Sequence, residues 1–232
     1  MTSGARPPAA CLIGWPAAHS RSPLIHRYWL RTLGIGGGYV IEAVPPDDLR
    51  DFVLRLSLRG FVGANVTIPH KESVLALSTP DARAQAIGAA NTLWFADGEL
   101  RSTNTDVEGF INNLDACTPG WYKAAEALVL GSGGSSRAVV FGLIERGIKR
   151  IYLANRTLAR ARAIAEKFGA AVQPVGWEKI GELLPRAGLL VNTTPLGMLL
   201  YQAVRGFELW FGRRPQVTAE LRALVEADLA DS

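Results

Sequence analysis

Short apolar segments alternate with amphipathic stretches through the first hundred residues, a pattern typical of strands separated by helices. The apolar segments predict strands at 10–13, 39–44 and 61–66. The amphipathic stretches predict helices at 23–33, from Asp47 or Asp48 to Leu58, and at 69–77. Two further apolar segments, 91–95 and 100–103, flank Asp97-Gly98, which is typical of a two-residue hairpin turn.

The second half continues the alternation after a helix at 107–114 and a loop at 118–120. An apolar strand at 127–130 leads through a glycine-rich turn into a helix at 136–146, which Gly147 ends. Further strands are predicted at 150–154, 171–175 and 189–191, with helices at 157–169 and 177–184 between them. Strands separated by helices pair in parallel, so we expect an α/β fold with a doubly wound sheet here.

Composition narrows the class of protein. Hydrophobic residues make up 48% of the 232 residues and charged residues 20%, which is ordinary for a globular protein. No apolar run is long enough to span a membrane, and residues 1–10 lack the order of a signal peptide, so we expect a cytoplasmic protein. The net charge of +4 is spread along the chain, which argues against nucleic acid as a partner. Cys11 and Cys117 lack metal-ligand spacing, so we expect no metal site and two buried thiols.

Six small residues directly follow the predicted strand at 127–130: Gly131, Ser132, Gly133, Gly134, Ser135 and Ser136. Glycine at the first and third of these positions permits a tight turn and close approach of a pyrophosphate to the N-terminus of the next helix. Between a strand and a helix, this pattern predicts a dinucleotide cradle. The alternative is a simple connecting loop.

The end of the following strand indicates which dinucleotide is bound. It reads Asn155, Arg156 and Thr157, with Arg160 one helical turn later. No acidic residue is present to bind the ribose 2′-hydroxyl of NAD, whereas an arginine suits a 2′-phosphate. We therefore predict NADP as the cofactor, the alternative being that Arg156 is an ordinary surface residue.

Polar clusters follow the predicted strands of the first half, at the rim where α/β sheets bind ligands. They are His19–Pro23, Asn65–Lys71, Ala90–Thr92 and Asn104–Asp106. Each cluster alone is compatible with turn or capping chemistry, for example Ser22 as an N-cap before Pro23. Lys71 is the only lysine among the first 120 residues, which hints at lysine-specific chemistry.

Taken in order, these clusters closely resemble the motifs of the shikimate dehydrogenase family. The matching motifs are Gly14-x-Pro16-x-x-His19-Ser20-x-Ser22-Pro23, Asn65-Val66-Thr67-x-Pro69-x-Lys71, Gly88-Ala89-Ala90-Asn91-Thr92, Asn104-Thr105-Asp106, Gly131-x-Gly133-Gly134, Asn155-Arg156-Thr157, Asn192-Thr193-Thr194-Pro195-x-Gly197-Met198 and Gln202. The resemblance implies NADPH-linked reduction of 3-dehydroshikimate to shikimate, on the pathway to aromatic amino acids.

The resemblance also implies a two-domain α/β fold. Residues 1–106 and 199–232 would form a substrate-binding, catalytic domain, and residues 107–198 a Rossmann-like nucleotide domain. The C-terminal helices would return to the first domain. Two serines at the carboxylate site and arginine at the nucleotide site favour the NADP-linked shikimate branch over the quinate/shikimate branch, and the protein would be a monomer or a homodimer.

Residue roles carried over from the resemblance form three groups. Ser20 and Ser22 would bind the substrate carboxylate. The ring hydroxyls would be held by Asn65, Thr67, Asn91 and Gln202. Thr193 and Met198 would join the glycine turn in binding the cofactor.

Lys71 and Asp106 would be the catalytic pair at the ketone or alcohol carbon, facing the nicotinamide across a shared crevice. Hydride transfer to a ketone creates an alkoxide, which needs a proton and a nearby positive charge, and a lysine can provide both. The alternative for this pair is a structural ion pair at the edge of a cleft. His19 and His70 flank the motifs and are expected to make structural hydrogen bonds instead.

One part of the family pattern is broken. Leu196-Gly197-Met198 matches the end of one family motif and the start of a later one, so the stretch normally between them is missing. A β-α-β unit has about 30 residues, and the loss is of roughly that size. The nucleotide domain would then be truncated to about four strands. Two hypotheses follow, an active dehydrogenase and a catalytically weak remnant that binds nucleotide or a partner.

Overall fold

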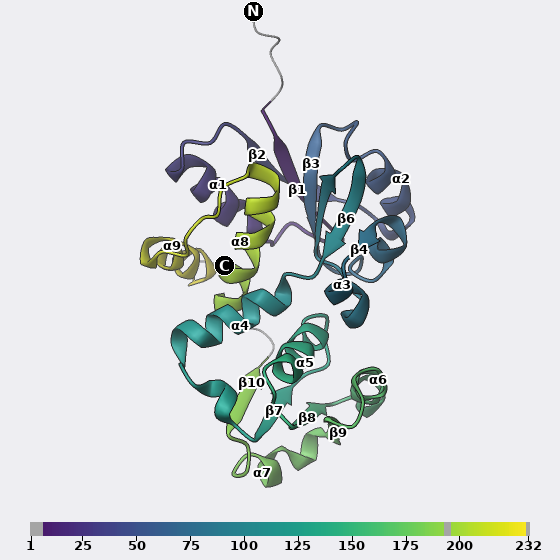
Figure 1. Cartoon of the computed structure of the whole chain (residues 1–232), viewed down its shortest axis with the longest axis vertical. Coiled ribbons are helices and arrows are strands. Elements are labelled where there is room, and N and C mark those ends of the chain that lie inside the picture. Colours follow the sequence, from purple (N-terminus) through teal and green to yellow (C-terminus); the bar gives the residue numbers. More distant parts are fainter. Residues whose placement is uncertain (1–6, 193–195, 231–232) are drawn as a thin grey trace, which may run out of the picture. The chain divides into compact units, whose positions relative to one another are not determined.

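The computed structural model describes residues 7–192 and 196–230. The chain forms two compact units, unit 1 with Met1–Thr105 and Leu200–Ser232, and unit 2 with Asp106–Leu199. Both are built from strands and helices (Figure 1), as the predicted α/β fold class requires. Within the described residues, no helix is both long enough and apolar enough to cross a membrane.

Unit 1 contains a mixed six-stranded sheet. Its strands are β1 (Ala9–Gly14), β2 (Gly38–Ala43), β3 (Phe61–Val66), β4 (Thr79–Pro80), β5 (Thr92–Ala96) and β6 (Glu99–Thr103). The spatial order is β2-β1-β3-β5-β6-β4. β1 pairs in parallel with β2 and β3, and β5 pairs antiparallel with β3 and β6.

The hairpin between β5 and β6 confirms the predicted turn. Asp97 has φ 54° and Gly98 has φ 79°, both in the left-handed region that this type of two-residue turn requires. Ala96 therefore pairs with Glu99, and the strands that carry Thr92 and Thr103 are held in register.

The central strands are buried on both faces. Ala10 and Leu12 of β1 pack into one core with Trp210, whereas Cys11 and Ile13 pack into another on the opposite side. The alternation follows from the two-residue period of a strand. The sheet is thus covered by helices on both faces. Polar side chains that could bind a ligand are therefore expected at the ends of its strands.

The helices of unit 1 include those predicted, with altered bounds, and α3, which was not predicted. They are α1 (Ser22–Thr32), η1 (Pro46–Asp48), α2 (Leu49–Leu54), η2 (Ser73–Leu77), α3 (Ala82–Ile87), α8 (Leu196–Phe211, which belongs to unit 1 from Leu200 onward) and α9 (Ala219–Ala230). The α-helix predicted over 69–77 is wrong, because only 73–77 is helical and that segment is a 3₁₀ helix. The Lys71 carbonyl accepts a hydrogen bond from the Ala90 amide (2.8 Å), and the Leu75 amide bonds to Glu72 instead (3.3 Å).

The C-terminal helices return to unit 1, as predicted, and lie next to α1 (Figure 1). Trp210 of α8 donates from Nε1 to the Leu93 carbonyl at 2.8 Å. This bond passes over Gly63 of β3, where a Cβ atom would clash with both partners. Glycine at this position therefore permits α8 to pack directly on the sheet.

Unit 2 contains the predicted parallel sheet. Its strands are β7 (Glu126–Leu130), β8 (Arg150–Asn155), β9 (Val172–Gly176) and β10 (Leu189–Asn192), in the order β10-β7-β8-β9. This is the order of the first four strands of a doubly wound dinucleotide fold. The described residues thus hold the four strands expected of a truncated nucleotide domain.

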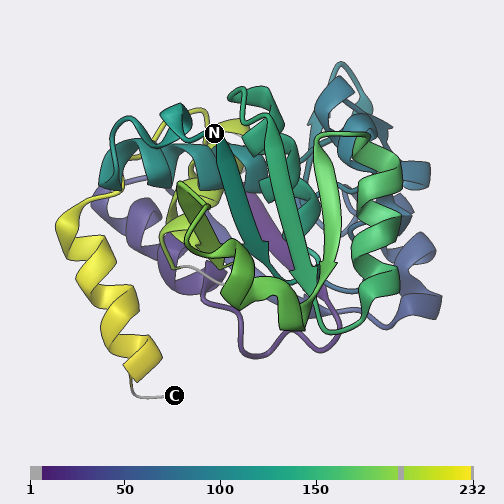
Figure 2. The same ribbon diagram turned by 90° about the horizontal axis from the view of Figure 1, so that it is seen from below.

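The helices of unit 2 are α4 (Asp106–Cys117), η3 (Trp121–Lys123), α5 (Ser136–Glu145), α6 (Leu158–Phe168), η4 (Trp177–Lys179) and α7 (Ile180–Leu183). α6 lies beside β9 (Figure 2). Cys117, at the end of α4, is exposed, contrary to our expectation, whereas Cys11 is buried. The last turn of an amphipathic helix leaves its outer face in water, and Cys117 falls on that face.

Candidate functional site

Asn91 is the centre of a buried polar network in unit 1. Its side chain is 3% exposed, and its Oδ1 accepts hydrogen bonds from the Thr105 amide (2.8 Å), the Thr105 hydroxyl and the Thr92 hydroxyl (both 3.1 Å). Its carbonyl accepts from the Val66 amide at 2.8 Å. Asn91 therefore ties the ends of β3 and β6 to the start of β5.

Asn91 contacts two of the other predicted ring-hydroxyl residues. Asn91 Nδ2 donates to Gln202 Oε1 at 3.3 Å, and Asn65 Nδ2 donates to the Asn91 carbonyl at 3.3 Å. These residues come from β3, the start of β5 and α8. Carboxamides both donate and accept hydrogen bonds, so such a cluster suits a ligand with several hydroxyl groups.

Tyr39 is a member of this network that the sequence analysis missed. Its hydroxyl donates to Asn65 Oδ1 at 2.6 Å, and its ring stacks on His26 with centroids 4.2 Å apart. Burial, the main cause, raises the pKa of Tyr39 well above its ordinary value, so the phenol remains a neutral donor. Because Tyr39 falls in an apolar strand, its residue type was the only signal available.

Thr67 and Lys71 lie on the segment that follows β3. The Thr67 amide donates to the Ile13 carbonyl (2.9 Å), and its methyl group occupies the space that a Cβ on Gly14 would need. The Lys71 carbonyl is held by the Ala90 amide, next to Asn91. The side chains of Thr67 and Lys71 are both partly buried.

Ser20 and Ser22 form a small hydroxyl pair where the loop after β1 enters α1. Ser20 Oγ donates to Ser22 Oγ at 3.2 Å and accepts from the Ser22 amide at 3.2 Å. Ser22 is the first residue of α1 and not its N-cap, which is Arg21. The capping interpretation of Ser22 is therefore wrong, because Ser20 supplies the hydroxyl that satisfies the helix-start amide.

The two histidines that flank the motifs differ in environment. His70 is buried, and its Nε2 is 2.7 Å from the Val44 carbonyl, which is the structural hydrogen bond that was predicted. The His19 side chain is exposed, and its carbonyl accepts from Arg21 Nη1 at 2.7 Å.

Asp106 is the first residue of α4 and is 1% exposed. It directly follows Thr105, whose amide and hydroxyl are bound by Asn91. A carboxylate in the first turn of a helix is stabilised by the unpaired backbone amides there.

The glycine turn in unit 2 has the form that a phosphate cradle needs. Gly131 has φ 97°, which disfavours any residue with a Cβ atom, and nothing lies within 4 Å of the position that a Cβ on Gly133 would take. Ser136 is fully buried, and its hydroxyl donates to the Gly131 carbonyl at 2.8 Å. Gly134 and Ser135 complete the turn, with Ser135 as the N-cap of α5.

Asn155 links this turn to the end of β8. Its Oδ1 accepts from the Ser132 amide (3.2 Å), and its Nδ2 donates to the Thr157 carbonyl (2.8 Å). The Ser132 hydroxyl is buried without a hydrogen-bond partner among the described residues. A buried hydroxyl of this kind is a position where a bound polar ligand would supply the missing partner.

Arg156 and Arg160 are both exposed near the end of β8. Asn155 pairs with Gly176 in the sheet, so Arg156 and Trp177 are the residues immediately beyond the paired ends of β8 and β9. The Arg156 guanidinium lies 5.9 Å from the Trp177 ring centroid, a contact that the sequence analysis missed. Thr157 is the N-cap of α6 but makes no side-chain capping bond.

The remaining predicted cofactor residues lie near the junction with α8. Thr193 falls outside the described residues. Met198 is buried in the first turns of α8. The strand–glycine turn–helix unit of unit 2 and the network of amide side chains of unit 1 are both typical of a nucleotide-dependent enzyme with a polar substrate.

Comparison with known proteins identifies the family. The sequence profile described as the shikimate dehydrogenase substrate binding domain matches residues 12–93. The profiles described as shikimate / quinate 5-dehydrogenase and as shikimate 5′-dehydrogenase C-terminal domain match residues 117–200 and 196–224. A shikimate dehydrogenase (NADP(+)) of Rhodopseudomonas palustris is 60% identical over 270 residues, covering 96% of this chain and 98% of the relative. The chain belongs to the shikimate dehydrogenase family.

Solved structures agree with this assignment. Shikimate dehydrogenase of Aquifex aeolicus has a TM-score of 0.84 and 27% identity, with 98% of this chain and 99% of that chain covered. The enzyme of Thermus thermophilus in complex with NADP(H) and shikimate has a TM-score of 0.82 and 32% identity, with 95% and 99% covered.

The relatives also carry residues that this chain lacks. The 270 aligned residues exceed the 232 residues of the chain, so at least 38 residues of the Rhodopseudomonas relative have no counterpart here. Because nearly all of both chains is covered, the missing residues are internal. The two C-terminal profiles overlap at residues 196–200, which contain the Leu196-Gly197-Met198 that matches two motifs.

Proposed function

We propose that this protein catalyses the NADP-linked interconversion of 3-dehydroshikimate and shikimate. The observation that carries the proposal is the contact of Asn65, Asn91 and Gln202 in unit 1. These three residues are far apart in the sequence, and the family resemblance assigns all three to one ligand. Their contact supports a substrate site whose polar groups suit a ring with several hydroxyls.

The proposed substrate site has two parts. Asn65, Thr67, Asn91 and Gln202 hold the ring hydroxyls, and the hydroxyl pair of Ser20 and Ser22 donates to the carboxylate. Hydroxyl donors bind a carboxylate without placing another full charge in the site. This pair of serines favours shikimate over quinate as the substrate.

The proposed cofactor site is the glycine turn with the end of β8. The φ of Gly131, the open space at Gly133 and the Ser132 hydroxyl, which lacks a partner in the described part of the chain, all suit a pyrophosphate. Arg156, just after the end of β8, and Arg160, in the first turn of α6, would bind the 2′-phosphate of NADP. NADP, when bound, supplies or accepts the hydride.

Lys71 and Asp106 are proposed as the acid/base pair. Lys71 donates a proton to the oxygen that gains negative charge when the ketone is reduced, and it removes that proton in the reverse direction. The Asp106 carboxylate accepts a hydrogen bond from the Lys71 ammonium, which orients the lysine, and from the hydroxyl that this oxygen carries in shikimate. The backbone bond from Ala90 to Lys71 supports this role, because it fixes Lys71 next to Asn91.

A second candidate function is a nucleotide-binding remnant with little turnover. The observation in its favour is the internal gap of at least 38 residues relative to the Rhodopseudomonas enzyme. A gap of that size is longer than the roughly 30 residues of one β-α-β unit. The described part of unit 2 has four strands, as expected of a nucleotide domain that lacks such a unit.

One experiment separates the two functions. NADPH consumption with 3-dehydroshikimate is measured alongside NADP⁺ and shikimate binding by calorimetry, with quinate as the competing substrate. Turnover with binding of both ligands supports the dehydrogenase. Binding without turnover supports the remnant, and insertion of the Rhodopseudomonas segment after Met198 should then restore activity. If neither NADP⁺ nor shikimate binds, both functions are refuted.

A further inference from the structure

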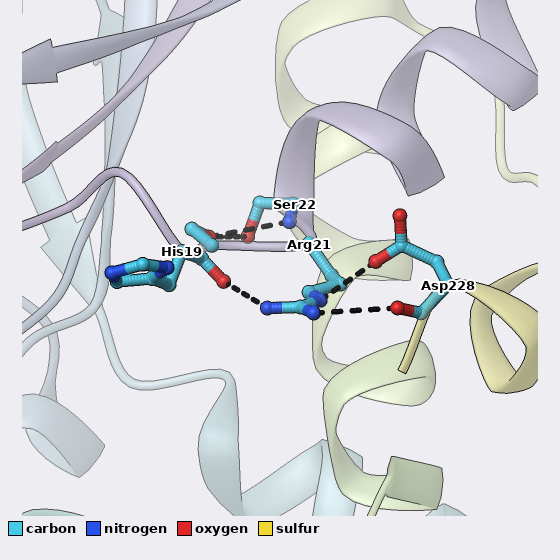
Figure 3. Close-up of polar contacts among 5 residues, drawn as sticks. His19, Arg21, Ser22 and Asp228 are labelled. Carbon is cyan, nitrogen blue, oxygen red and sulfur yellow. Dashed lines mark hydrogen bonds and ion pairs between the residues drawn. The ribbon is translucent and has the colours of Figure 1, made fainter. Parts of the chain in front are cut away.

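The loop that carries Ser20 and Ser22 is attached to the C-terminal helix α9 through one side chain. Arg21 lies between the two serines, and its Nε is 2.8 Å from Asp228 Oδ2. Its Nη2 donates to the Asp228 carbonyl at 3.5 Å, and its Nη1 donates to the His19 carbonyl at 2.7 Å. Figure 3 shows the Arg21 guanidinium held between His19 and Asp228.

This arrangement differs from an ordinary surface ion pair, which contributes little to stability. The Arg21 side chain is only 17% exposed, although that of Asp228 is 47% exposed. The guanidinium also binds two backbone carbonyls, one on the loop and one on α9. The guanidinium therefore constrains the backbone just before Ser20. An ion pair between two side chains alone would not constrain that backbone.

α9 has other anchors, so this contact is not needed to hold the helix in place. Tyr28 donates to Glu220 Oε2 at 2.9 Å, and Trp29 donates to the Gln216 carbonyl at 3.0 Å, just before α9. Leu221 and Val225 of α9 are fully buried. Loss of the Asp228 carboxylate should therefore leave α9 docked and release only the loop.

We infer that Arg21 and Asp228 are positioning residues for the substrate carboxylate site. Together they hold the turn at Ser20 in the form in which Ser20 Oγ binds the Ser22 amide and both hydroxyls are presented to the carboxylate. The inference rests on the proposed function, because it assigns a role to the loop that binds the substrate. It gives α9 a part in substrate affinity, although no residue of α9 contacts the substrate in this proposal.

The test compares Asp228→Asn with Glu226→Gln, a charge-neutralising control at an exposed position two residues earlier on α9. Shikimate and NADP⁺ dissociation constants are measured by calorimetry, with KM and kcat wherever turnover is measurable. Asp228→Asn should weaken shikimate binding about three- to tenfold, as expected for an impaired charge-assisted contact. NADP⁺ affinity and kcat should stay within about twofold, since the perturbation is confined to the substrate loop.

Arg21→Lys and Arg21→Gln provide the second arm. Lysine keeps the positive charge but lacks the guanidinium group that donates to several acceptors at once. The shikimate affinity of Arg21→Lys should therefore lie between those of the wild type and Arg21→Gln. The double variant Arg21→Gln/Asp228→Asn should be no worse than the weaker-binding single variant if the two residues act as a unit.

The possible failures are distinguishable. If the wild-type protein does not bind shikimate, that result refutes the proposed function. If the wild-type protein binds shikimate and the Asp228→Asn variant has the same shikimate affinity as Glu226→Gln, the positioning role is refuted. The role is also refuted if Asp228→Asn binds shikimate more tightly, because Arg21 is then released toward the carboxylate. If Asp228→Asn does not fold, equal shikimate affinities of Arg21→Gln and wild type give the same refutation.

Discussion

We predict that His26 makes the stability of unit 1 depend on pH. The ring is fully buried and stacks on Tyr39 and Phe207, with centroid distances of 4.2 and 6.0 Å. Neither ring nitrogen has a hydrogen-bond partner among the described residues. Burial lowers the pKa of His26 from 6.5 to about 3, and the nearby Asn65 side chain opposes this shift only in part. The folded protein therefore holds a neutral imidazole.

The direction of the pH effect follows from that shift. Between pH 6.5 and about pH 3 the unfolded chain binds a proton at His26 that the folded chain does not, so the free energy of unfolding falls as the pH falls through this window. One pKa unit corresponds to about 1.4 kcal/mol, and the window from pH 6.5 to pH 4.5 spans about two units, so acidification from pH 7 to pH 4.5 should remove about 2.5 kcal/mol. Tyr39 is stacked on the ring and bonded to Asn65, so the substrate site is lost with the fold.

The assay is urea unfolding at pH 7, 5.5 and 4.5, followed by near-ultraviolet circular dichroism, for the wild-type protein and for His26→Phe. Phenylalanine keeps an aromatic ring and cannot be protonated. Any cost of its larger ring is independent of pH. The wild-type protein should lose about 2.5 kcal/mol more than the variant between pH 7 and pH 4.5. Parallel pH profiles would refute the reasoning, because the two proteins differ only at His26.

Three other predictions concern packing, chemistry and cofactor choice. Gly63→Ala should lower the free energy of unfolding by about 2–4 kcal/mol, since the new Cβ displaces Trp210 from the sheet; an unchanged urea midpoint would contradict this. Lys71→Met should reduce kcat by about two to four orders of magnitude while NADP⁺ affinity stays the same, and retained turnover would exclude Lys71 as the acid/base. Arg156→Asp should weaken NADP⁺ binding at least about tenfold more than NAD⁺ binding in calorimetry, and equal losses would disprove the 2′-phosphate assignment.

Much of the local structure could be predicted from neighbouring residues. The Asp97-Gly98 turn, the glycine turn after β7 and the end of α5 at Gly147 all depend on backbone conformations that glycine favours. The dinucleotide-type unit could also be predicted, because its strand, its turn and the next helix are contiguous in the sequence. Such features need no knowledge of distant parts of the chain.

Segments shaped by distant partners were predicted poorly. The 69–77 segment has an amphipathic pattern, but the Ala90 amide binds the Lys71 carbonyl and only a 3₁₀ helix forms. Tyr39 and His26 were not predicted as part of the site environment, because their residue types within apolar elements do not show which groups they face.

The sequence by itself determined the α/β class, the order of the elements, the glycine turn and the family to which the chain belongs, because each depends on residue types in a given order. Only the tertiary structure decided that Gln202 contacts Asn91, that Tyr39 binds Asn65 and that Arg21 reaches Asp228 on α9. Each of these contacts joins residues from different elements. Their formation depends on how helices pack on a sheet, and the order of residues along the chain does not encode that packing in any local pattern.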